Sequence, residues 1–163
     1  LWVRPEVMQP FKIQKGKRFS QQLLPKVCLN ILGGQLVIFA YAFCMGVLSE
    51  RSSIITLRHE RLLPSGRELF LHLAGIIIFN EITFFYGHWL MHQKFGRFNL
   101  YAMIHKKHHE FTSPVGLVAS YCHPVEMLVS NAFPLTFGAA VLRAHTYSLI
   151  VWVGFAVLGT QFH

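Results

Sequence analysis

The sequence predicts an all-α fold, an integral membrane bundle of about four helices with a histidine cluster on its cytosolic side. Hydrophobic residues make up 53% of the 163 residues and charged residues 13%, an apolar balance that is high for a soluble domain. Two apolar stretches, 23–48 and 69–91, each have the length of a membrane-spanning helix. Six of the ten histidines fall between positions 88 and 123, which indicates a metal site.

The charged residues favour a membrane over a nucleic acid as the partner of this chain. Fifteen Lys and Arg oppose seven acidic residues, all of them Glu, for a formal net charge of +8. The cations stand in short runs between apolar stretches, whereas a nucleic-acid-binding protein gathers them on a soluble surface. We therefore predict no nucleic-acid partner.

The sequence divides into a basic amino-terminal arm and a predicted membrane domain. Residues 1–22 are polar and basic, and they fit either a juxtamembrane arm near anionic head groups or a solvated tail. Residues 23–163 form the predicted membrane domain. Its first span, 23–48, carries Lys26 as its only charge.

A charged connector, 49–68, separates the two predicted spans and ends in the turn sequence Pro64-Ser65-Gly66. The second span, 69–91, contains Glu81 and His88. Ionisable side chains are costly inside a bilayer, so both residues are functional candidates.

Polar and basic residues return at 93–112. An apolar stretch, 115–142, follows with interruptions at Pro124 and Pro134, and then the apolar run 147–160. Two spans separate the amino-terminal arm from 93–112, so both lie on one side of the membrane. Their cations predict that this side is the cytosol.

The histidines form two boxes with helical spacing. His88 and His92, in H-W-L-M-H, are four residues apart and share one face of a helix. In H-K-K-H-H, His105, His108 and His109 again share one face if the segment is helical. Five neutral imidazoles on two neighbouring helix ends can hold at least one divalent cation, and two with more ligands.

Ligating imidazoles need a partner for their second ring nitrogen, and three nearby carboxylates are candidates: Glu81, Glu110 and Glu126. His123, in Y-C-H-P-V-E, fits a metal ligand, a donor that orients a ligand, or a core histidine before a proline. The remaining internal histidines are isolated, and we expect structural roles for them: His59, His72 and His145.

Ligand chemistry alone does not choose the metal, because the usual affinity order favours zinc or copper over iron at imidazole sites. Structural zinc sites are closed and mostly thiolate-ligated, and only Cys122 lies near the boxes. An all-nitrogen site beside a membrane fits oxygen chemistry better, since oxidation of an unactivated C–H bond needs a redox metal.

At these residues the sequence resembles the fatty acid hydroxylase and sterol desaturase superfamily, whose boxes read H-x3-H and H-x2-H-H. The resemblance rests on E-I-T-F-F-Y-G-H-W-L-M-H, Y-A-M-I-H-K-K-H-H-E-F-T-S-P, S-Y-C-H-P-V-E and V-S-N, and it points to the C-4 methylsterol oxidase branch. It is strongest from Glu81 to Asn131.

The resemblance implies a multi-pass enzyme of the endoplasmic reticulum membrane with two Fe ions at the cytosolic end of its helices. The enzyme would use O2 as co-substrate to hydroxylate, oxidise or desaturate a sterol or fatty acyl lipid. Electrons would come from NAD(P)H through cytochrome b5 or its reductase. The implied metal ligands are His88, His92, His105, His108 and His109.

The family pattern also continues beyond the end of this sequence. His163 falls at the first His of an H-x-G-Y-H motif, which a further H-x2-H-H box follows in the family. Two six-coordinate irons need roughly eight protein ligands, and this chain offers seven at most, counting His123 and His163. We therefore expect a carboxy-terminally truncated domain that is inactive by itself.

Two other function classes are compatible with the boxes. One is a non-catalytic membrane protein that keeps the fold around a structural zinc or partial metal site. The other is a divalent-metal transporter, which is less favoured because transporters place ligands in several spans near the bilayer midplane. The boxes here flank one span end.

Overall fold

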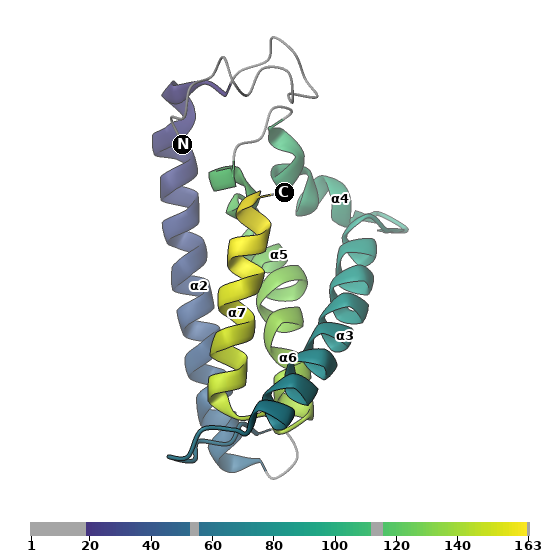
Figure 1. The fold of residues 1–163 in the computed structure, drawn as a ribbon. Helices are drawn as coiled ribbons and strands as arrows, with labels where there is room; N and C mark the ends of the chain where they lie inside the picture. Colours follow the sequence, from purple (N-terminus) through teal and green to yellow (C-terminus); the bar gives the residue numbers. More distant parts are fainter. Residues whose placement is uncertain (1–18, 53–55, 112–115, 163) are drawn as a thin grey trace.

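The computed structural model describes residues 19–52, 56–111 and 116–162, and these are built almost entirely of helices (Figure 1). A short 3₁₀ turn leads into α2 (Leu24–Arg51), and α3 (Gly66–Met91) follows the connector. Within the described residues, these two helices are long and apolar enough to cross a membrane. Only 6% of the most apolar window of each is buried, which distinguishes them from the core helices of a soluble protein.

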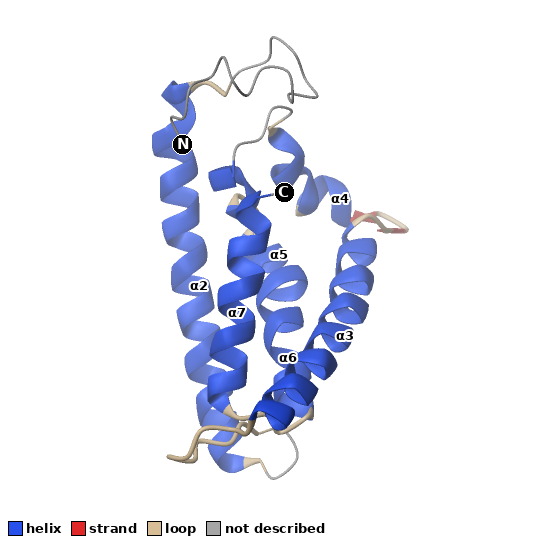
Figure 2. Ribbon diagram, viewed as in Figure 1, coloured by secondary structure: helices blue, strands red, loops and turns tan. Residues whose placement is uncertain are grey.

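The second half of the chain alternates short turns with helices. A hairpin of β1 (Lys94–Phe95) and β2 (Phe98–Asn99) leads into α4 (Leu100–Met103), and Figure 2 shows how small this sheet is. The remaining elements are the 3₁₀ segments η3 (His105–Glu110) and η4 (Gly116–Ser120), the continuous helix α5 (Pro124–Glu126), η5 (Met127–Ala132) and α6 (Phe133–Val141), and finally α7 (Thr146–Phe162).

The outer surface of α2 is apolar along much of its length. Leu29, Leu36, Phe39 and Phe43 are each about 70% exposed or more. A water-soluble monomer rarely presents such a continuous apolar surface, whereas hydrocarbon solvates it without cost. The exposure therefore agrees with the predicted first span.

Small residues let α3 and α6 approach closely. A Cβ built on Gly138 would lie 2.7 Å from the Cβ of Phe79 and 3.1 Å from the Cα of Ile76. Where the α3 end meets η5, a Cβ on Gly87 would lie 3.1 Å from the carbonyl oxygen of Val129. Membrane helices gain packing from such approaches, because lipid gives them no hydrophobic force toward each other.

The two predicted proline interruptions have different outcomes. Pro124 starts α5, where the missing N–H is an unpaired group of any helix start. At Pro134 the chain stays helical, contrary to the expected break, because the preceding turn η5 is a π-helix. The wider turn is a common place for a proline inside a helix, since a regular α-turn would clash with its ring.

The amino-terminal end of α2 and the segment η3 lie at the same end of the bundle (Figure 1). The side chain of Asn30 makes two hydrogen bonds with the backbone of Cys122, at 3.1 and 3.2 Å. Nearby, Lys26 forms an ion pair with Glu110. This agrees with the prediction that the segments before the first span and after the second share one side.

Packing at Gly138 gives a first testable prediction. Gly138→Ala should lower the free energy of unfolding by about 1–3 kcal/mol, because the new methyl group overpacks the contact with Phe79. Thermal unfolding in a neutral detergent measures this loss. Gly154→Ala in α7 is the matched control, since nothing lies within 4 Å of a Cβ built at that position and the substitution should be neutral or stabilising. Equal stability of the two variants would contradict the close-packing argument.

Candidate metal centre

A tight reversal of the chain brings the two histidine boxes together. His88 lies in the last turn of α3, and His92 is the residue that caps its carboxyl end. The hairpin then turns at Gly96, whose φ of +57° suits a glycine at the first central position of a two-residue turn. Asn99 accepts a hydrogen bond from the N–H of Ala102 and so starts α4, which delivers η3 over the end of α3.

Four histidines converge at this point: His88, His92, His105 and His109. One ring nitrogen from each lies within 4.8 Å of the corresponding atom of every other. The Nε2 atoms of His88 and His92 are 3.3 Å apart, and those of His105 and His109 are 2.9 Å apart. Such convergence of imidazole nitrogens is the arrangement that a bound cation requires, so the donor set fits a metal.

His105 is the most constrained member of the cluster. Its side chain is fully buried, and its Nδ1 lies 2.6 Å from Oε1 of Glu126. A neutral imidazole that donates its Nδ1–H to this carboxyl group keeps the lone pair of Nε2 for the cluster. A carboxylate that holds the outer nitrogen of a ligating histidine fixes the tautomer and the ring orientation.

Two rings of the cluster resist protonation, that of the buried His105 and that of the exposed His109. Desolvation lowers the pKa of His105 to about 4 and, together with the neighbouring histidines, lowers the pKa of His109 from its ordinary value. Burial also raises the pKa of Glu126 to about 7, and its Oε2 has no hydrogen-bond partner among the residues described. Neutral imidazoles have free lone pairs, so the site is ready for a metal at physiological pH.

Two of the other three predicted site histidines are described, and neither belongs to this group of four. His108 belongs to η3, but its Nδ1 lies 3.1 Å from the carbonyl oxygen of Tyr121, and its ring centroid is 5.5 Å from that of His109. His123 caps α5, where its Nδ1 accepts the N–H of Val125. His163 lies outside the described residues. A ligand role for each of these three stays a prediction.

The three candidate carboxylates also differ. Glu126 contacts an imidazole as described above. Glu110 instead accepts hydrogen bonds from Lys26 and, at 2.8 Å, from the hydroxyl of Tyr121. Glu81 is exposed, and its carboxylate accepts from the side-chain amide of Asn80 at 3.4 Å. In the part of the chain that the structure describes, Glu126 alone of the three orients a ring of the cluster.

Sequence reasoning missed two aromatic rings that border the cluster. The ring of Tyr101 stacks on His92, with centroids 5.5 Å apart, and that of Phe84 stacks on His88 at 5.9 Å. Both lie four residues before a box histidine, Tyr101 before His105 and Phe84 before His88. For Phe84 and His88 that spacing was a usable signal for contact on one helical face, whereas the stacking of Tyr101 on His92 depends on the chain reversal.

Cysteine does not take part in the centre. The converging group in the described part of the chain contains no cysteine, and burial raises the pKa of the Cys122 thiol to about 12. The three isolated histidines make hydrogen bonds far from the cluster: His59 to Thr146, His72 to Ser148, and His145 to the carbonyl of Glu60. These contacts agree with the structural roles expected for them.

The lowered pKa values predict how metal binding depends on pH. Protons compete with a metal only when they can hold the ring nitrogens, and His105 resists protonation down to about pH 4. Cobalt(II) occupancy, followed by visible absorption, should therefore fall on acidification with a midpoint below about 6.5, the ordinary imidazole value. A midpoint at or above that value would show that burial does not keep these rings neutral.

Glu126 gives a second prediction for the same assay. Glu126→Ala should weaken cobalt affinity roughly 10- to 100-fold, the usual cost of losing the partner of a ligating histidine. Glu126→Gln should retain part of the affinity, because its amide oxygen can still accept from Nδ1 of His105. Glu81→Gln serves as the matched control. A loss for Glu81→Gln equal to that for Glu126→Ala would place the orienting carboxylate on α3 instead.

Comparison with known proteins agrees with the resemblance read from the boxes. The family model described as "Fatty acid hydroxylase" matches residues 73–163. Fatty acid hydroxylase domain-containing protein 2 of Homo sapiens is 30% identical over 165 residues, which cover 96% of this chain and 46% of that protein. Methylsterol monooxygenase 2-2 of Arabidopsis thaliana is 34% identical over 98 residues, which cover 60% of the chain and 35% of that protein.

A third relative is the very-long-chain aldehyde decarbonylase GL1-8 of Oryza sativa subsp. indica, 31% identical over 168 residues, with 98% of the chain and 57% of that protein covered. No solved structure matches the chain. The chain spans roughly half the length of the curated relatives it matches. The family model covers more than half of the chain, including both histidine boxes. The chain therefore belongs to the fatty acid hydroxylase family.

Proposed function

We propose that the whole protein is a non-haem di-iron oxidoreductase that uses O2 to oxidise a sterol or fatty acyl lipid in the endoplasmic reticulum membrane. The observation that carries the proposal is the cluster of four imidazoles at the end of two membrane-length helices. The relatives named as hydroxylase, methylsterol monooxygenase and aldehyde decarbonylase support a lipid-modifying reaction.

The donor set suits iron in an oxygenase. His88, His92, His105 and His109 would hold one ion, and His108 is the nearest further imidazole for a second. Nitrogen ligands leave an iron able to change oxidation state, and the bound metal would supply the activation of O2 for attack on a C–H bond. The remaining ligands of a complete pair, with His163 as a candidate, are part of the proposal.

The chain's own residues prepare the site for that chemistry. Glu126 accepts a hydrogen bond from Nδ1 of His105 and fixes the direction in which its Nε2 points. Tyr101 and Phe84 restrict the rings of His92 and His88 by stacking. Such restriction lowers the conformational entropy that the ligands lose when they bind a metal.

A cavity of about 450 Å³ on the outer face of α3 supplies a place for the lipid. Its lining residues are Glu81, Phe84, Phe85, His88, Trp89 and His92. Its wall contains both aromatic rings and two histidines of the cluster, His88 and His92. A hydrocarbon chain or ring that enters from the bilayer would therefore lie beside the metal. The lining aromatic side chains are exposed, so the surrounding hydrocarbon of the bilayer would exclude water there.

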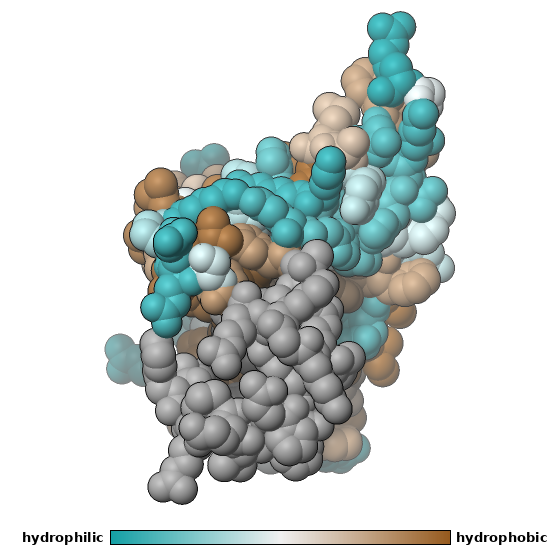
Figure 3. All heavy atoms as spheres, turned by 90° about the horizontal axis from the view of Figure 1, so that it is seen from above, coloured by the Kyte–Doolittle hydropathy of each residue, from teal (hydrophilic) through white to brown (hydrophobic). Residues whose placement is uncertain are grey.

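The proposal also includes the side of the membrane on which the cluster lies and the source of its electrons. Seen from the end that carries the cluster, the described surface is largely hydrophilic, while apolar residues gather toward its edges (Figure 3). We place this end in the cytosol, where cytochrome b5 or its reductase would deliver electrons from NAD(P)H. A basic end of this kind also agrees with the cation bias of cytosolic loops.

A test uses the full-length protein expressed in a microsomal membrane. We expect bound iron by elemental analysis and a lipid product that gains label from ¹⁸O2. His109→Ala should abolish both, since it removes one of the four converging ligands. His59→Ala, which changes an exposed histidine outside the cluster, should keep both. Full-length protein that holds zinc alone and forms no oxidised lipid would defeat the proposal.

A non-catalytic zinc protein is the second candidate, and one observation favours it. Four imidazoles within 4.8 Å are sufficient for a single tetrahedral ion, which is the geometry of a structural zinc site. The same elemental analysis separates the two functions, because the zinc candidate requires one tightly held zinc and no response to O2.

A further inference from the structure

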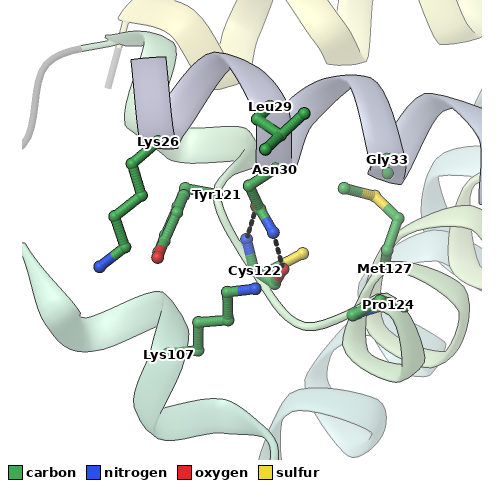
Figure 4. Close-up of a pocket in the computed structure, with 10 residues that line it drawn as sticks. Lys26, Leu29, Asn30, Gly33, Lys107, Tyr121, Cys122, Pro124 and Met127 are labelled. Atoms are coloured by element: carbon green, nitrogen blue, oxygen red, sulfur yellow. Dashed lines mark hydrogen bonds between the residues drawn. The ribbon is translucent and has the colours of Figure 1, made fainter. Parts of the chain in front are cut away.

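A second cavity, distinct from the histidine cluster, opens between α2 and the segments from η3 to η5. Its volume is about 410 Å³, and none of the four clustered histidines lines it. Figure 4 shows Lys26, Lys107 and Tyr121 on one side of it, and Gly33 and Met127 on the other. The cavity therefore has one cationic half and one apolar half.

The cationic half holds more positive than negative charge. Two ammonium groups lie over the ring of the buried Tyr121, Lys107 at 5.3 Å and Lys26 at 5.8 Å from its centroid. Glu110 pairs with Lys26 and also accepts from the Tyr121 hydroxyl. No carboxylate of the described residues forms an ion pair with Lys107. One positive charge is thus available to a ligand.

The two halves differ in depth along the predicted span. Lys26 stands in the first turn of α2, and Gly33 follows seven residues later, which is roughly 10 Å deeper at the helical rise. Nothing lies within 4 Å of a Cβ built on Gly33, so the helix surface is open there. The exposed Leu29 continues this apolar surface. In a bilayer crossed by the predicted span, the charges would meet the head-group layer and the apolar half would meet the acyl chains.

We propose that this cavity binds a phospholipid with an anionic head group, its phosphate at the ammonium group of Lys107 and one acyl chain over Gly33. Basic pockets at the membrane surface between helices favour anionic head groups. A free phosphate would use the ammonium groups and leave the apolar half unfilled. The lipid would contact both α2 and η3, and so would stabilise the position of η3, which carries His105 and His109.

Native mass spectrometry of the purified chain in a neutral detergent tests the proposal. The probes are dioleoyl phosphatidic acid, dioleoyl phosphatidylcholine and inorganic phosphate. We expect phosphatidic acid to bind roughly fivefold more tightly than phosphatidylcholine, the effect of about one lysine at a membrane surface. Lys107→Gln should remove this preference. Lys106→Gln, a change at the exposed neighbour that does not line the cavity, should retain it.

A second pair of variants probes the apolar half. Gly33→Leu should weaken binding of both lipids, because its side chain occupies the open surface. Gly46→Leu, at another open position of α2, should not. Equal binding of the two lipids, no effect of Lys107→Gln and Gly33→Leu, or phosphate binding as tight as lipid binding would each overturn the proposal. The assay needs no metal, so its outcome is independent of the proposed oxidase activity.

Discussion

The contact between His105 and Glu126 is the interaction on which the site depends. It joins η3 to the composite helix formed by α5, η5 and α6, and the two residues are 21 positions apart in the sequence. Both side chains belong to residues at most 2% exposed, so neither can exchange this partner for water. A buried polar pair of this kind specifies one arrangement, because any alternative leaves a polar group without a partner. The orientation of the second histidine box follows from it.

The packing of the helices also positions the residues of the metal centre. Gly87 and Gly138 allow α3 to lie directly against η5 and α6, so the helix that carries the first box is held against the helix that carries Glu126. The Asn30 side chain ties α2 to the loop before His123 through two backbone hydrogen bonds. Close backbone contact and side-chain hydrogen bonds are the forces available between helices in lipid. They position polar groups at one end of an otherwise apolar bundle.

The features that depend on local periodicity could be predicted from the sequence. Apolar length predicted α2 and α3, and the four-residue spacing predicted that His88 and His92 share a face. The second box departs from that rule, because its residues form the 3₁₀ segment η3 and Nδ1 of His108 lies 3.1 Å from the carbonyl oxygen of Tyr121. The choice of Glu126 over the other two carboxylates could not be predicted, since it depends on how the composite helix packs beneath η3.

The place of the cluster at the carboxyl end of α3 has an electrostatic consequence. The aligned peptide dipoles of a long helix give its carboxyl end a partial negative charge of about half an electron. His88 and His92 occupy that end of the 26-residue helix α3. The backbone of α3 therefore attracts a cation to this position before any side chain ligates it.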